Sequence, residues 1–342
     1  MRKLSKLFYL GSIGIVIVFV AALFISLQLI NQSKETKLNP STQKEKLIIG
    51  FSQIGTESAW RIQNTKSIFE AAKDRDIEIL YDDAKQKQSN QLKAIRSFIV
   101  YQVDVIVFVP IVSDGWDNVL QEAKDANIPV IVIDRQINAD PSLYAGFLGE
   151  DGFEQGKSAA KFLINKCNNS PKKKFNILEL AGTANSSIAV SRAEGFREII
   201  EKDARFNFIH SEDGDFLRSR GKEIMDKIIA KSGGLKIGNE PIDVIFSHND
   251  PMTLGLLESL DEHKISTKNT IIISIDAEQE SIDALKEGKL NCVVECNPNL
   301  GPTLMDLVQK IAAGETIPRT TYMNETVFTE NDDFSTYVPR GY

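Results

Sequence analysis

Short runs of apolar, mostly β-branched residues alternate with amphipathic stretches from Leu47 almost to the end of the 342-residue chain. Each apolar run, such as LIIGFS, DVIVFV or PVIVID, lacks the polar residue at every second position that a half-exposed strand would show. Strands that are apolar on both faces belong to parallel sheets covered by helices on both sides. The alternation therefore predicts an α/β fold with doubly wound parallel sheets.

The expected elements form two successive sets of similar size. The first set comprises strands Leu47–Ser52, Ile77–Tyr81, Asp104–Val109 and Pro129–Asp134, and helices Ser58–Lys73, Gln88–Tyr101 and Trp116–Asn127. The second comprises strands Asn176–Leu180, Phe206–His210, Ile242–Ser247, Thr270–Ile275 and Asn291–Cys296, and helices Phe153–Lys166, Ala189–Ile200, Arg218–Ala230, Met252–Glu262, Ser281–Glu287 and Leu300–Ala313. Two doubly wound units of this size predict two lobes with a cleft between them.

The amino-terminal segment predicts attachment to a membrane. Leu7–Ile30 is a run of 24 residues without a charge, which as a helix would be about 36 Å long. Arg2, Lys3 and Lys6 precede it, so the following chain should lie outside the cytoplasmic membrane. We expect residues 1–31 to be an uncleaved signal anchor, with a cleaved signal peptide as the alternative. Residues 32–46 are polar and predict a flexible tether.

Composition and motifs exclude several classes of function. The net charge of −7 argues against a nucleic-acid partner, because phosphate binding needs a clustered basic face. The three cysteines and three histidines show no metal-ligand spacing, so we expect no metal. Neither a dinucleotide fingerprint, a P-loop, a nucleophile elbow nor a zinc-protease motif is present. We therefore expect neither a cofactor nor an enzymatic reaction.

Polar and aromatic residues gather just after the expected strands, where ligands bind in open α/β sheets. The candidate binding residues are Glu57, Trp60, Arg61, Asp134, Arg135, Arg192, Asn249, Asp276 and Asn297. Carboxylates and guanidinium groups together satisfy hydroxyls that both donate and accept hydrogen bonds, and an indole covers an apolar ring face. The set therefore predicts a sugar site. Several members have simpler interpretations: Asp134 and Arg135 as a turn with a surface ion pair, Asn249 as part of a helix cap, Trp60 as core, and Arg192 as a surface partner of Glu194.

Several motifs resemble one known family. IGFSQIGTESAWR, KAIRSF, IPVIVIDR, SRAEGFRE and HNDPMTLG resemble type I periplasmic sugar-binding proteins of the ribose- and galactose-binding group. HSEDGDFLRSRGKEIM and the ending RGY are most similar to its galactofuranose-binding members. The resemblance implies a hinge of three crossings, near Glu150, Cys296 and Tyr322. The first lobe would then hold residues 47–150 and about 297–322, and the second 151–296 and about 323–342.

The same resemblance implies roles for the candidate residues. Trp60 would stack on the sugar, with Glu57 and Arg61 in the same loop, and Asp134 and Arg135 would form an acid–arginine pair on the ring hydroxyls. Arg192, Asn249 and Asp276 would reach in from the second lobe, with Cys296 or Asn297 at the hinge. Val109-Pro110 replaces an asparagine of the ribose-type site, which argues against ribose.

The expected function is capture of a monosaccharide by lobe closure, followed by delivery to an ABC-type sugar permease. The alternative is a membrane-anchored sensor that reports the bound sugar to a histidine kinase or chemoreceptor. An anchor that stays attached favours the sensor, whereas the family resemblance favours the importer.

Overall fold

The structure, a computed structural model, describes residues 26, 28 and 46–342. The chain divides into two units, Met1–Lys46 and Leu47–Tyr342, and the second carries both sheets. Among the described residues no helix is long and apolar enough to cross a bilayer. The expected anchor and tether, residues 1–31 and 32–46, lie outside the described residues apart from Ser26, Gln28 and Lys46. Both therefore stay predictions.

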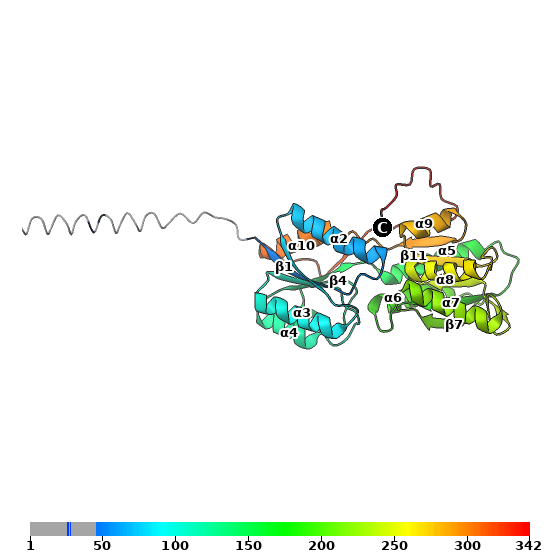
Figure 1. The fold of residues 1–342 in the computed structure, drawn as a ribbon, viewed down its shortest axis with the longest axis horizontal. Helices are drawn as coiled ribbons and strands as arrows, with labels where there is room; N and C mark the ends of the chain where they lie inside the picture. The colour runs from blue at the N-terminus through cyan, green and yellow to red at the C-terminus, as the bar shows by residue number, and fades with distance from the viewer. Residues whose placement is uncertain (1–25, 27, 29–45) are drawn as a thin grey trace, which may run out of the picture. The chain divides into compact units, whose positions relative to one another are not determined.

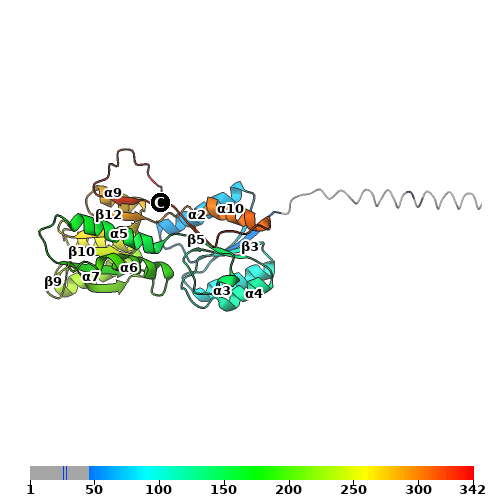
Figure 2. The ribbon, with the colours of Figure 1, turned by 180° about the vertical axis from the view of Figure 1, so that it is seen from behind.

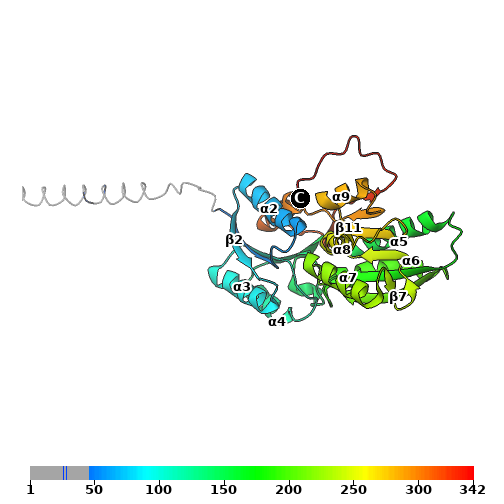
Figure 3. The same ribbon diagram turned by 45° about the vertical axis from the view of Figure 1, so that its right-hand side comes forward.

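The first lobe is built on a six-stranded sheet with helices on both faces (Figure 1). Its strands, in spatial order, are β13 (Thr320–Tyr322), β5 (Gly146–Gly149), β4 (Val130–Asp134), β3 (Val105–Phe108), β1 (Ile48–Gln53) and β2 (Glu78–Asp83), and all pairs are parallel. One face packs on α2 (Ala59–Asp74) and α10 (Gly301–Ala312), which lie side by side in Figure 2. The other packs on α3 (Gln88–Tyr101) and α4 (Asp117–Asp125), below the sheet in Figure 3. The short 3-10 helix η1 (Pro141–Leu143) links β4 to β5.

The second lobe repeats this arrangement. Its strands, in spatial order, are β14 (Val327–Thr329), β12 (Cys292–Glu295), β11 (Ile271–Asp276), β10 (Val244–Ser247), β6 (Phe175–Ala181) and β7 (Phe206–Asp213), with only the edge strand β14 antiparallel. One face packs on α5 (Gly152–Cys167) and α6 (Ser187–Ile200), the other on α7 (Arg218–Ser232), α8 (Asp250–Glu262) and α9 (Gln279–Lys286). A small hairpin of β8 (Lys236–Ile237) and β9 (Glu240–Pro241) follows α7.

The two-lobed α/β fold expected from the sequence is confirmed. The runs that predicted central strands are buried on both faces, as β3, β4 and β10 show. The sequence did not reveal β5, whose run GFLG begins and ends in glycine, or the short strands β13 and β14 at the sheet edges. Glycine weakens a strand pattern, and three-residue strands are too short to show a period.

The chain passes between the two sheets three times. It leaves the first sheet after β5 and enters α5, returns after β12 into α10, and passes from β13 to β14. The connecting residues are 150–151, 296–300 and 323–326. Because each lobe is assembled from separate parts of the chain, these three crossings form the covalent connection between the lobes.

Helices α5 and α6 approach closely because each presents a glycine at their contact. A Cβ atom on Gly156 would stand 2.2 Å from the carbonyl oxygen of Arg192, and one on Gly195 would stand 2.0 Å from that of Phe153. A side chain at either position would force the two backbones apart. This contact fixes α6, and with it Arg192, against α5.

We expect Gly195→Ala to lower the free energy of unfolding by about 1–2 kcal/mol. Overpacking costs about 1–3 kcal/mol or more, which outweighs the gain of about 1 kcal/mol in helix propensity. Urea unfolding followed by circular dichroism measures the effect. Gly234→Ala is the control, because nothing lies within 4 Å of its added methyl group. Equal unfolding midpoints for Gly195→Ala and the unaltered protein would contradict the close approach.

Candidate ligand-binding site

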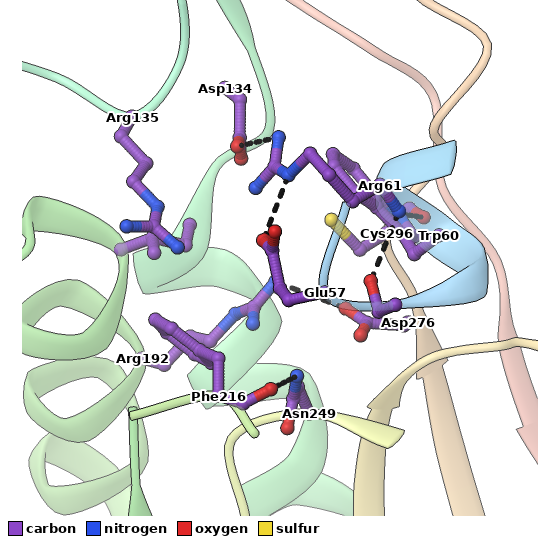
Figure 4. A pocket seen from close by; sticks show the side chains of 12 residues that line it. Glu57, Trp60, Arg61, Asp134, Arg135, Arg192, Phe216, Asn249, Asp276 and Cys296 are labelled. Carbon is purple, nitrogen blue, oxygen red and sulfur yellow. Dashed lines mark hydrogen bonds and ion pairs between the residues drawn. The ribbon is translucent and has the colours of Figure 1, made fainter. Parts of the chain in front are cut away.

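A pocket lies between the two lobes, where the carboxyl ends of their strands meet (Figure 4). The space inside it, together with the open solvent at its mouth, is about 370 Å³. Eight of the nine candidate residues line it: Glu57, Trp60, Arg61, Asp134, Arg135, Arg192, Asn249 and Asp276. The lining is completed by four further residues: Ser58, Ile188, Phe216 and Cys296.

Asn297 is the candidate that the structure does not bring into this lining. Its side-chain oxygen accepts a hydrogen bond from the backbone N–H of Asn299, 3.0 Å away, within the second crossing. The neighbouring Cys296 lines the pocket instead. We therefore assign Asn297 a turn-forming role in the crossing.

Arg61 is held between two carboxylates of its own lobe. It lies in the first turn of α2, where Ser58 caps the helix by accepting a hydrogen bond from its backbone N–H. Its Nη1 lies 2.7 Å from Asp134 Oδ2, and its Nε donates to Glu57 Oε1 at 3.2 Å. Burial disfavours the charge of Arg61, but Asp134 and Glu57 outweigh that effect and hold its pKa above the usual range. Arg61 is thus a fixed cation in the pocket.

Asp134 and Arg135 both line the pocket, so their expected joint action on ring hydroxyls stays a prediction, but the direct ion pair of Asp134 is with Arg61. Asp134 ends β4 with φ +63°, in the left-handed region, so the chain turns sharply and the next side chain leaves in another direction. Arg135 Nη1 instead donates to the carbonyl oxygen of Ile111 at 3.2 Å. Adjacency in sequence suggested a pair that this turn separates.

The two pocket aspartates occupy equivalent positions in the two lobes. Asp134 ends β4, and Asp276 ends β11 with φ +134°, so both have backbone conformations that side chains rarely adopt. Gly149 lies opposite Asp134 in β5, and a Cβ there would stand 3.1 Å from the Asp134 backbone. Strained backbone of this kind clusters at ligand sites, where it aims a side chain.

Phe216 is an aromatic wall between two arginines from different lobes. The Arg135 guanidinium carbon lies 5.1 Å from the centre of its ring, and that of Arg192 lies 6.0 Å away. The ring packs directly on Gly182, where a Cβ atom would stand 1.9 Å from it. Burial lowers the pKa of Arg135 to about 10, so this side chain stays charged at neutral pH.

Arg192 is anchored by the second lobe. Its Nε donates to Gln155 Oε1 at 2.8 Å, its Nη1 donates to the carbonyl oxygen of His248 at 2.6 Å, and its Nη2 lies 3.7 Å from Asp276 Oδ1. Burial raises the pKa of Asp276, against the opposing effect of Arg192. The alternative interpretation of Arg192 as a surface partner of Glu194 is wrong, because Arg192 is only 3% exposed and makes these buried contacts.

A buried hydrogen-bond network around His248 fixes the residue whose carbonyl oxygen accepts from Arg192. His248 accepts a hydrogen bond from the Gly182 N–H at Nδ1, so its Nε2 donates to Glu179 Oε1, 3.2 Å away. Arg197 donates to both carboxylate oxygens of Glu179. Burial lowers the pKa of His248, so the imidazole stays neutral. The backbone carbonyl that holds Arg192 is thereby fixed in place.

Trp60 belongs to the first lobe but is held by groups outside it. Its backbone N–H donates to Glu278 Oε1 at 2.8 Å, and its indole N–H donates to the carbonyl oxygen of Cys296 at 2.6 Å. Two further bonds join the lobes: Ser113 N–H to the Asn185 oxygen, 3.1 Å, and Gln136 N–H to Ser187 Oγ, 2.7 Å. These contacts describe a closed arrangement of the lobes.

The charges that line the pocket are balanced. Three arginines (Arg61, Arg135, Arg192) face three carboxylates (Glu57, Asp134, Asp276). Four of their buried atoms have no hydrogen-bond partner among the described residues: Glu57 Oε2, Arg61 Nη1, Asp134 Oδ2 and Arg135 Nε. Arg61 and Asp134 are close enough to form an ion pair but are not aligned as a hydrogen bond. The pocket therefore offers donors and acceptors together, with as many carboxyl groups as arginines, which suits a neutral polyhydroxylated ligand.

Sequence reasoning missed Phe216 because the strand before it is longer than expected. The pattern placed the end of that strand at His210, whereas β7 continues to Asp213. Asp215 and Phe216 both have positive φ, +54° and +60°, and this turn brings the Phe216 ring into the pocket. If the strand had been predicted to end at Asp213, the residues just after it would have included Phe216 as a candidate.

Comparisons with known proteins agree on one family. Residues 49–316 match the model of the periplasmic binding protein domain. The galactofuranose-binding protein YtfQ of Escherichia coli K12 is 38% identical over 80% of this chain and 84% of its own length.

Two solved structures are also similar. A protein from Mycobacterium smegmatis in complex with β-D-fucofuranose is 40% identical, with a TM-score of 0.78 over 83% of this chain and 91% of that one. The binding protein of the arabinose ABC transporter of Shewanella sp. ANA-3, bound to α- and β-L-arabinofuranose, is 34% identical, with a TM-score of 0.77 over 83% and 92%.

Asn249 has two contacts that variants can separate. Its Oδ1 accepts from the Met252 N–H and so caps α8, while its Nδ2 donates to the carbonyl oxygen of Phe216 at 3.1 Å. We expect Asn249→Ala to lower the free energy of unfolding by about 1–2 kcal/mol, because the cap is lost. Asn249→Ser should recover most of that loss, since serine also caps helices. Equal stability of the two variants in urea would show that the cap contributes nothing.

Proposed function

The chain belongs to the periplasmic binding protein domain family, and from this premise we propose that it captures a monosaccharide in its furanose form, galactofuranose or a close relative, between its two lobes. It then delivers the sugar to an ABC-type permease. The observation that carries the proposal is the set of three arginines and three carboxyl groups around the pocket, with buried atoms that lack a hydrogen-bond partner among the described residues. The protein is a binding protein and not an enzyme.

The charge balance favours a sugar over an anion. A sulfate, phosphate or carboxylate ligand needs a site with excess positive charge, whereas here each arginine charge is matched by a carboxylate. A sugar hydroxyl accepts from an arginine N–H and donates to a carboxylate oxygen, so adjacent hydroxyls satisfy both kinds of group. Trp60 and Phe216 offer aromatic surfaces for the C–H faces of the ring.

The furanose form rests on the three relatives described above. Each is at least 34% identical to this chain, and each is described with a five-membered sugar ring: galactofuranose, fucofuranose or arabinofuranose. The sugars differ in their substituents but share the ring size. We propose that this chain recognises the same ring form.

Capture proceeds by lobe closure. Glu57, Arg61, Asp134 and Arg135 come from the first lobe, and Arg192, Phe216, Asn249 and Asp276 from the second. A sugar that contacts both groups binds the closed form more tightly than the open form, so it shifts the population toward closure. The contacts of Trp60 with Glu278 and of Gln136 with Ser187 form only when the lobes meet.

Delivery to a permease is favoured over sensing. Family membership implies an extracytoplasmic location, and the Shewanella relative is a component of an ABC transporter. A sensor would leave sugar uptake intact when its gene is deleted and abolish sugar-dependent transcription. Loss of uptake on deletion, with transcription unchanged, is the expected result.

Asp134→Asn tests the binding site without changing its shape. The variant removes one charge from a buried cluster and leaves Arg61 paired with Glu57 alone. Truncating one partner of such a pair costs about 2–5 kcal/mol of binding, so we expect galactofuranose to bind at least about 30-fold more weakly. Titration calorimetry measures the affinity.

Asp125→Asn is the control, since this aspartate is exposed at the end of α4 in the same lobe and lies outside the pocket lining. The affinity of Asp125→Asn for galactofuranose should equal that of the unaltered protein. Unchanged affinity in Asp134→Asn would remove Asp134 from the binding site.

A further inference from the structure

Each of the three crossings between the lobes contributes one potential metal-binding side chain to a single cluster. Glu150 follows β5, Cys296 follows β12, and Glu325 lies between β13 and β14. One carboxylate oxygen from each glutamate and the Cys296 Sγ lie within 4.8 Å of one another. Because the three residues are distant in sequence, no short-spacing motif reveals them.

Glu150 is a buried carboxyl group whose hydrogen-bonding capacity is unsatisfied by the described residues. It is 2% exposed, and neither of its carboxylate oxygens has a hydrogen-bond partner among the described residues. A buried carboxylate without a partner is costly, so it needs either a proton or a cation. Burial, followed by the charges of Asp134 and Glu325, raises its pKa, and the opposing charge of Arg192 does not outweigh them.

The other two donors are held in position. Glu325 Oε1 accepts a hydrogen bond from Gln155 Nε2 at 2.7 Å, and Gln155 also accepts from Arg192. The Cys296 backbone is fixed by the Trp60 indole, which donates to its carbonyl oxygen. Cys296 is a free, buried cysteine, so its sulfur is available as a ligand. Outer hydrogen bonds of this kind orient metal ligands.

The donor set selects the class of cation. A thiolate favours Zn²⁺ and similar metals, whereas Ca²⁺ and Mg²⁺ take oxygen ligands. Tetrahedral Zn²⁺ with bonds of about 2.0–2.3 Å separates its ligands by about 3.5 Å. The upper limit of 4.8 Å on the separations of the three ligand atoms is roughly 1 Å wider than this spacing. Two carboxylates and a thiolate carry three negative charges, and the charge of Arg192 acts on all three groups.

We propose that Glu150, Cys296 and Glu325 form a binding site for Zn²⁺ or a similar thiophilic divalent cation that ties the three crossings together. The fourth position of the metal is open to water or to a solute. Since every ligand lies on a different crossing, the bound metal constrains the hinge itself. The site is separate from the proposed sugar contacts, apart from Cys296, which also lines the pocket.

The test is a calorimetric titration of the full-length protein with ZnCl₂, in a non-coordinating buffer without sugar. We expect one Zn²⁺ per chain and a higher melting temperature, because the metal binds the folded state. In Glu150→Gln and Cys296→Ala the affinity should fall by more than the 10–100-fold that loss of an outer partner causes. Cys292→Ala, a buried cysteine on β12 that lies outside the cluster, should bind as the unaltered protein does.

A second measurement needs no variant. Co²⁺ bound at this site should show a thiolate-to-metal charge-transfer band in the near ultraviolet, which excess Zn²⁺ removes. Absence of stoichiometric Zn²⁺ binding, a Co²⁺ complex without the thiolate band, or equal affinities in Glu150→Gln, Cys296→Ala and the unaltered protein would each overturn the proposal.

Discussion

The burial of opposite charges against one another is the constraint on which the pocket lining of each lobe depends. Arg61, Asp134, Arg192 and Asp276 are each at most 6% exposed. Removing one member of a buried ion pair costs about 3–5 kcal/mol, because the other is left without compensation. The residues around the pocket therefore have to be positioned together. The capped start of α2, the left-handed ends of β4 and β11, and the glycine contact between α5 and α6 all serve that positioning.

In the function proposed above, the same charges couple capture to closure. Each lobe pairs charges of its own: Arg61 with Glu57 and Asp134 in the first lobe, and Arg192 with Asp276 at 3.7 Å in the second. Several buried polar atoms in the first lobe still lack a partner. A ligand with hydroxyls can satisfy both sets at once only when the lobes meet. Closure thus depends on the hydrogen bonds that a neutral ligand completes.

The sequence predicted most of the fold and most of the pocket lining, because both follow from local patterns. Apolar runs mark the central strands, and the strand-end rule brought eight candidate residues to one pocket. The sequence patterns failed where three-dimensional geometry determines which residues meet. The strand β5 was not recognised because glycines begin and end it. Phe216 was missed because β7 is longer than its sequence pattern indicated. The partner of Asp134 was not predicted because the chain turns sharply at this residue, with φ +63°. The cluster of Glu150, Cys296 and Glu325 depends on chain topology, which local patterns do not carry.

The central claim is that the pocket binds a neutral sugar through balanced charges. Calorimetric titration with galactofuranose at low and high ionic strength tests it most directly. Ionic strength strongly weakens the binding of charged ligands, whereas it has little effect on a neutral ligand in a buried site. We expect a dissociation constant of about one micromolar, equivalent to a binding free energy of about −8 kcal/mol. This constant should be the same at both salt concentrations. No measurable binding, or an affinity that falls steeply with salt, would contradict it.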